Sequence, residues 1–146
     1  MNAAEPLIPL TESECQALLR ANVLGRIALA AAGEIDIFPV NYVVDDEGRL
    51  VFRTAPGTKL AELVIHPSVA FEIDGVTGEE LYSVIVKGDA ERVESAAEIA
   101  ELERLPLKPW VPTIKEQFIR ITPTWTTGRR FTPGPEPERD PAGTPA

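Results

Sequence analysis

Residues 26–53 read RIALAAAGEIDIFPVNYVVDDEGRLVFR, and this stretch decides the fold. It contains three apolar runs that we expect to be strands: 26–31, 35–44 and 49–53. The connections 32–34 (AGE) and 45–48 (DDEG) have the composition of tight turns, so the three strands should form an antiparallel meander. Pro39 lacks an amide donor, which places the second strand at a sheet edge or at a bulge.

The flanking sequence adds helices and further strands. Residues 11–14 (TESE) and 95–98 (SAAE) have the pattern of a capping box, so each should open a helix. A third, short helix should follow the turn at 55–57 and end before Pro67. Three more runs predict strands: 68–74, 81–93 and 117–122, the last with 124–131 as a candidate continuation. Six strands with short connections describe a mainly β fold, a closed antiparallel barrel with helical additions.

The composition predicts one folded domain followed by a tail. A chain of 146 residues with 44% hydrophobic residues is long enough to close a single core. Residues 133–146 are rich in proline and carry no apolar side chain larger than alanine, so they cannot be buried. We therefore expect a domain over residues 1–132 and a disordered tail over 133–146.

Charge and hydropathy exclude several classes of partner. A net charge of -9 would repel a nucleic-acid backbone. No apolar run approaches the roughly 20 residues that a membrane helix needs. The single cysteine, Cys15, has no disulfide partner, and residues 1–10 lack the pattern of a secretory signal, so we expect a cytoplasmic protein. Cys15 should pack on the apolar side of the first helix.

The segment VFRTAPGTK, residues 51–59, combines cations, hydroxyls and a glycine turn that leads into a helix. Free amides at a helix start attract anions, and Gly57 lets the backbone come close to one. The candidate phosphate ligands are Arg53, Thr54, Thr58 and Lys59. The spacing differs from that of a Walker loop, which disfavours ATP. The alternative is a plain turn with a capping threonine and two solvated cations, and spacing alone does not decide between them.

No catalytic or metal-binding set stands out elsewhere. His66 has no second histidine or cysteine at metal-ligand spacing, so we assign no metal. No paired carboxylates and no Ser-His-Asp arrangement is recognisable, and the catalytic residues stay unassigned. Trp125 is expected in the core. The acidic residues of the late helix, Glu98, Glu101 and Glu103, are expected to form a solvated face.

The sequence resembles the pyridoxamine 5'-phosphate oxidase-like family of FMN-binding split β-barrels over about residues 10–131. The motifs that carry the resemblance are 25–28 (GRIA), 38–42 (FPVNY), 51–59, 83–91 and 120–123 (RITP). The resemblance implies a six-stranded antiparallel split barrel with an N-terminal helix and short inserted helices. It also implies a homodimer that holds FMN at its interface.

The resemblance further implies roles for individual residues. Arg53, Thr54, Thr58 and Lys59 would hold the FMN phosphate. The strand segment Pro39, Val40 and Asn41 would lie along the flavin ring, mostly through backbone groups, and Ser83 would face the cofactor. Trp110 either covers the flavin or anchors a loop, and Arg26 reaches either the cofactor or a carboxylate; both alternatives stay open.

The chain departs from the vitamin B6 oxidases at several positions. Leu60 stands where those enzymes commonly have a second phosphate-binding cation, and Ser83 stands where a glutamine is common. Residues 128–131 (GRRF) do not match the arginine-rich segment that binds pyridoxal phosphate. We therefore expect an FMN-dependent oxidoreductase with a small organic acceptor rather than a vitamin B6 oxidase. The alternatives are an F420-dependent reductase and a non-catalytic flavin- or haem-binding protein.

Overall fold

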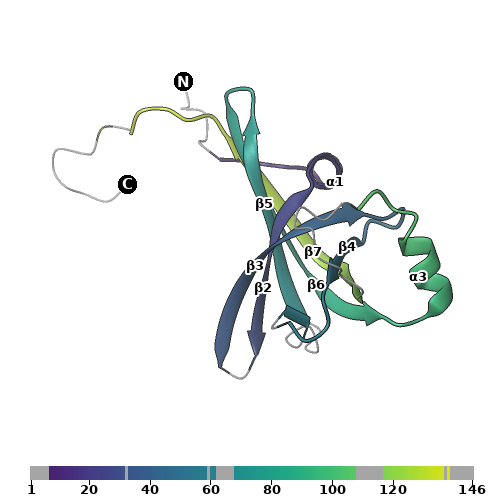
Figure 1. Cartoon of the computed structure of the whole chain (residues 1–146). Helices are drawn as coiled ribbons and strands as arrows, with labels where there is room; N and C mark the ends of the chain where they lie inside the picture. The colour runs from purple at the N-terminus through teal and green to yellow at the C-terminus, as the bar shows by residue number, and fades with distance from the viewer. Residues whose placement is uncertain are drawn as a thin grey trace.

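The computed structural model describes residues 7–31, 33–58, 60–61, 68–107, 117–136 and 138. The helices and strands are β1 (Ile8–Pro9), α1 (Glu12–Ala21), β2 (Leu24–Ala31), β3 (Glu34–Val44), β4 (Leu50–Thr54), β5 (Ser68–Thr77), β6 (Glu80–Val93), α3 (Ala96–Leu102) and β7 (Gln117–Phe131). They are shown in Figure 1. Among the described residues, no helix is long and apolar enough to cross a membrane.

The strands form one antiparallel sheet that closes on itself. The order is β1-β7-β4-β3-β2-β5-β6, and β6 also pairs with β7. Six strands thus make a closed ring, as predicted, and the segment 124–131 continues β7. The two-residue strand β1 was not predicted, and it pairs only with the far end of β7, at Arg129 and Arg130.

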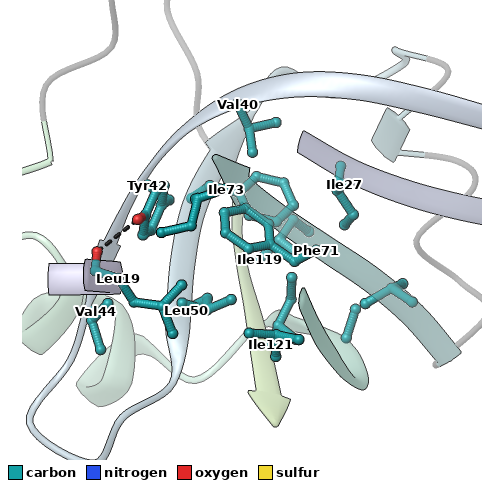
Figure 2. Packing of buried hydrophobic residues seen from close by; sticks show 14 of the residues in the cluster. Leu19, Ile27, Val40, Tyr42, Val44, Leu50, Phe71, Ile73, Ile119 and Ile121 are labelled. Atoms are coloured by element: carbon teal, nitrogen blue, oxygen red, sulfur yellow. Dashed lines mark hydrogen bonds between the residues drawn. The ribbon is translucent and has the colours of Figure 1, made fainter. Parts of the chain in front are cut away.

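Strand alternation places one set of side chains inside the ring (Figure 2). Phe52, Phe71 and Ile121 have no exposed surface, and the rings of Tyr42 and Phe71 meet edge to face with centroids 4.8 Å apart. The opposite face of β2, β3, β5 and the first half of β6 carries side chains that are exposed or half-buried. We call this surface the outer face.

Helix α1 packs against this core. Its predicted capping box is present: the Thr11 hydroxyl accepts from the Glu14 amide at 3.1 Å, and the Glu14 carboxylate accepts from the Thr11 amide at 3.0 Å. Cys15 and Leu19 are 1% exposed. The buried Tyr42 hydroxyl donates to the Leu19 carbonyl oxygen at 2.6 Å (Figure 2). Burial also raises the pKa of the Cys15 thiol, so Cys15 is a packing residue, as expected.

Helix α3 covers a second, smaller cluster outside the ring. Its N-cap, Ser95, accepts from the Glu98 amide. Val51, Phe118 and Leu102 are buried in this cluster. The predicted solvated face of α3 is incomplete, because the Glu98 carboxylate accepts from the buried Arg120 guanidinium at 3.3 Å. Arg120 also donates to Glu91 at 2.8 Å, so it bridges α3 and β6.

Two sequence expectations need correction. Strand β3 is not an edge strand, because it lies between β2 and β4. Its pairing with β4 runs only from Val44 to Tyr42, however, so Pro39 is paired on one side alone, with β2. Trp125 is not in the core: it is 50% exposed on β7, and the Lys87 ammonium lies 4.9 Å from its ring centroid. A bulge between Lys87 and Gly88 adjoins the tryptophan.

Candidate functional site

Two threonine hydroxyls hold the turn that follows β4. The Thr58 hydroxyl donates to the Ala55 carbonyl oxygen at 2.9 Å and accepts from the Ala61 amide at 3.2 Å. The hydroxyl oxygens of Thr54 and Thr58 lie 3.0 Å apart. A hydroxyl has a single proton, and that of Thr58 goes to Ala55, so Thr54 is the donor of this pair. Both protons are used inside the turn, and the Thr58 oxygen accepts from the Ala61 amide in the way that an N-cap residue does.

The tip of this turn is open. Gly57 has a φ of +76°, a conformation that favours glycine, and a Cβ built there would meet no atom of a described residue within 4 Å. Pro56, Gly57 and Thr58 are exposed. The backbone is therefore accessible to an anion, as the sequence predicts for this segment.

Arg53 lies on β4 just before this turn and has a hydrogen-bond donor that no described residue accepts. Its guanidinium carbon lies 4.7 Å from the centroid of the Phe118 ring. Its Nε atom is buried and makes no hydrogen bond to any described residue. Alternation puts Arg53 on the opposite face of β4 from Thr54, which is 4% exposed. The structure therefore brings Thr54 and Thr58 together but separates Arg53 from their hydroxyls.

Three residues singled out from the sequence lie outside the described residues: Lys59, His66 and Trp110. Their predicted roles stay predictions. Of the two cations predicted to hold the phosphate, only Arg53 is among the described residues.

The predicted ring-binding strand is part of β3, where β3 and β4 separate. Val40 is 8% exposed and belongs to the core, so its side chain packs inward. Pro39 and Asn41 share the outer face, and the Asn41 amide donates to the Val23 carbonyl oxygen at 3.3 Å. Asn41 lies just beyond the last β3–β4 pair, as Arg53 does. These two strands therefore present Pro39, Asn41 and Arg53 on one side.

Ser83 lies on the same outer face, on β6. It lines a hollow of about 440 Å³ together with Ile85, Trp125, Thr127 and Arg129. An aromatic ring and apolar atoms on the walls of a hollow suit a flat ring system. The exposed Trp125 belongs to this hollow and was missed, because an aromatic residue in a strand pattern is more often a core residue.

The pairing register shows how far these groups lie apart. Pro39 pairs with Arg26, Arg26 with Glu72, and Glu72 with Ile85. Three strand spacings, about 14 Å, therefore separate Pro39 from Ile85, and Ser83 is the next residue on that face. The outer face is continuous from β3 to β6.

A charged cluster in the middle of this face was not predicted. One nitrogen of Arg26, Nη1, contacts Glu72 Oε1 at 2.9 Å and Asp74 Oδ2 at 3.2 Å. The sequence leaves open whether Arg26 reaches a cofactor or a carboxylate, and in the structure Arg26 contacts two carboxylates. Burial, and next the neighbouring Asp74, raises the pKa of Glu72. The alternation of acidic and apolar residues at 72–74 was the feature of the sequence that could have predicted two carboxylates on this face.

The described part of the chain contains no group of three or more histidine, cysteine or acidic residues placed to bind a metal ion.

The six-strand ring defines the class of antiparallel split β-barrels. The model of the pyridoxamine 5'-phosphate oxidase family matches residues 11–130. The chain belongs to this family.

Three relatives show how the chain compares with known proteins. A provisionally named pyridoxamine 5'-phosphate oxidase from Corynebacterium glutamicum has a TM-score of 0.83 at 41% identity, over 92% of this chain and 100% of that one. The FAD binding protein from Mycobacterium smegmatis has a TM-score of 0.75 at 40% identity, over 85% and 98%. An uncharacterized Mycobacterium tuberculosis protein is 46% identical over 94 residues, which are 64% of this chain and 86% of that protein.

Proposed function

We propose that this protein binds a flavin, FMN in the first instance, and is an oxidoreductase that acts on a small organic acceptor. The observation that carries the proposal is Arg53, whose buried Nε makes no hydrogen bond to any described residue and which stands on β4 one residue before the turn at 54–58. A buried donor without a partner is costly, and an anionic ligand would satisfy it. The family and the M. smegmatis FAD binding protein support a flavin as that ligand.

The described residues fit the two ends of a flavin. Arg53 and the backbone at Gly57 suit the phosphate, while the threonine pair keeps the turn in shape. The outer face from Pro39 to Ser83 suits the flat ring, and the hollow beside Ser83 excludes part of the solvent from it. When bound, the flavin would supply the centre that accepts a hydride from a reduced donor and passes it to the acceptor. The protein would supply orientation and exclusion of water.

A second candidate is a flavin-holding protein without turnover. It is favoured by the M. smegmatis relative, which is named for FAD binding alone. Bound flavin that no reduced nicotinamide can bleach would support this candidate. Bleaching by NADH or NADPH, followed by recovery of colour with an added acceptor, would support the oxidoreductase.

Replacing Arg53 by methionine should weaken FMN binding while leaving riboflavin binding unchanged. Methionine keeps the packing against Phe118 but removes the charged donors. Charge-assisted hydrogen bonds contribute about 1.5–3 kcal/mol, so the dissociation constant for FMN should rise at least about tenfold. Quenching of flavin fluorescence measures both constants. Arg92→Met, which removes an exposed arginine paired with Glu94, is the control.

An unchanged FMN constant in Arg53→Met would show that Arg53 does not hold the phosphate. Absence of FMN and FAD binding to the unaltered protein would contradict the proposed function itself.

We further propose that the active form is a homodimer. Ile35 and Ile37 are 78% and 65% exposed on the β2–β3 hairpin, and a second copy would cover them. The variant Ile35→Glu/Ile37→Glu should raise the dimer dissociation constant at least about tenfold, roughly 1.4 kcal/mol. Sedimentation equilibrium measures this constant. Val76→Glu is the control, since Val76 is 65% exposed at the tip of the other long hairpin (Figure 1). A monomeric unaltered protein would refute the proposal.

A further inference from the structure

Arg26 on β2 is oriented by two acidic side chains of β5. Glu72 and Asp74 both contact the same guanidinium nitrogen, Nη1, at 2.9 and 3.2 Å. The two contacts fix the plane of the guanidinium more firmly than one would. Because Arg26 is 47% exposed, the group is held in place but is not covered.

The other donors of Arg26, on Nη2 and Nε, make no hydrogen bond to any described residue. An arginine has five N–H donors in a planar fork, and this fork is suited to oxygen acceptors that lie in one plane. Arg26 therefore presents an unused, oriented pair of donor groups on the outer face.

The position of Arg26 on this face is central. It pairs with Pro39 on one side and with Glu72 on the other, while Asp74 pairs with Ser83. A ligand whose phosphate lies at the β4 turn and whose ring extends towards Ser83 would pass over this cluster. The other charged groups on the face lie further along: Lys87 is beside Trp125, and Arg129 is opposite Ser83.

We propose that Arg26, held by Glu72 and Asp74, recognises the carbonyl edge of the flavin ring. This inference rests on the proposed function, since it names the contact for the ring of the same ligand. The C2 carbonyl oxygen and the adjacent ring nitrogen N1 would accept from Nη2 and Nε, and the cation would favour the negative charge that this part of the ring gains on reduction. In this proposal Arg53 binds the phosphate of the flavin and Arg26 binds its ring.

Two ligands separate these two roles, because riboflavin has the same ring as FMN but no phosphate. Arg26→Met should raise the dissociation constants for FMN and riboflavin by the same factor, about tenfold or more. Arg26→Lys, which keeps the charge but loses the planar fork, should recover only part of the affinity. Arg26→Met should also make the reduction potential of bound FMN more negative. Arg92→Met again serves as the control, and circular dichroism checks that each variant is folded.

The outcomes distinguish the two proposals. If the unaltered protein binds neither FMN nor FAD, the proposed function fails. If it binds FMN and Arg26→Met leaves both constants unchanged, the ring assignment is overturned. A loss of affinity for FMN but not for riboflavin would also overturn it, because Arg26 would then bind the phosphate. Should Arg26→Met fail to fold, Glu72→Gln, which loosens one of the two contacts on Arg26, should weaken both ligands equally; unchanged constants in that variant would overturn the assignment.

Discussion

Phe71→Ala should lower the free energy of unfolding by about 3–5 kcal/mol, the usual cost of removing a buried phenylalanine ring. Phe71 has no exposed surface, and its ring meets that of Tyr42 edge to face (Figure 2). A Cβ at Gly25 would lie 2.2 Å from its Cζ atom, so the ring fills the space that the glycine leaves. Removal of the ring leaves a cavity bounded by strands that cannot close together.

Urea unfolding followed by circular dichroism measures this loss. Val76→Ala is the control, because Val76 is 65% exposed and lies outside the proposed dimer contact, so this change should alter stability by no more than about 0.5 kcal/mol. A loss for Phe71→Ala as small as that of the control would show that Phe71 is not at the centre of the core.

Gly88→Ala is expected to cost about 1–3 kcal/mol or more, as overpacking does in a tight interior. A Cβ at Gly88 would lie 2.4 Å from the Thr122 carbonyl oxygen. This neighbour is backbone, so it cannot rotate away as a side chain would. The clash falls at the bulge between β6 and β7, the pairing that closes the ring.

The midpoint of thermal unfolding tests this second expectation. Gly134→Ala makes the same chemical change where a Cβ would meet no described residue within 4 Å, so its midpoint should match that of the unaltered protein. Equal midpoints for the two variants would contradict the close approach of β6 and β7.

Local signals explain why much of the fold was predictable. The capping box of α1 depends on Thr11 and Glu14 alone, and the strand runs depend on alternation within each run. Strand β1 was missed because a strand of two residues is too short to show an alternation of apolar and polar side chains. Trp125 was misplaced because its exposure depends on which face of β7 it occupies after the bulge, and a single strand does not reveal that face.

In the candidate site, too, the local features were predictable from the sequence and the long-range contacts were not. The turn at 54–58 is local, so its hydroxyls and glycine were recognised, although the spacing did not show that both hydroxyl protons are used within it. In the charged cluster, Arg26 is 46 positions from Glu72 and 48 from Asp74. Only the β2–β5 register brings them together. Such contacts depend on how the strands pair, and the sequence of a single segment does not specify that pairing.

The proposed flavin binding is tested most directly by the colour of the protein. The protein is incubated with excess FMN, and in parallel with FAD, desalted, and its visible absorption spectrum is recorded. We expect the bands of oxidised flavin to remain with the protein in near-stoichiometric amount, shifted from those of free flavin by the new surroundings of the ring. A colourless protein after both incubations would contradict the central claim.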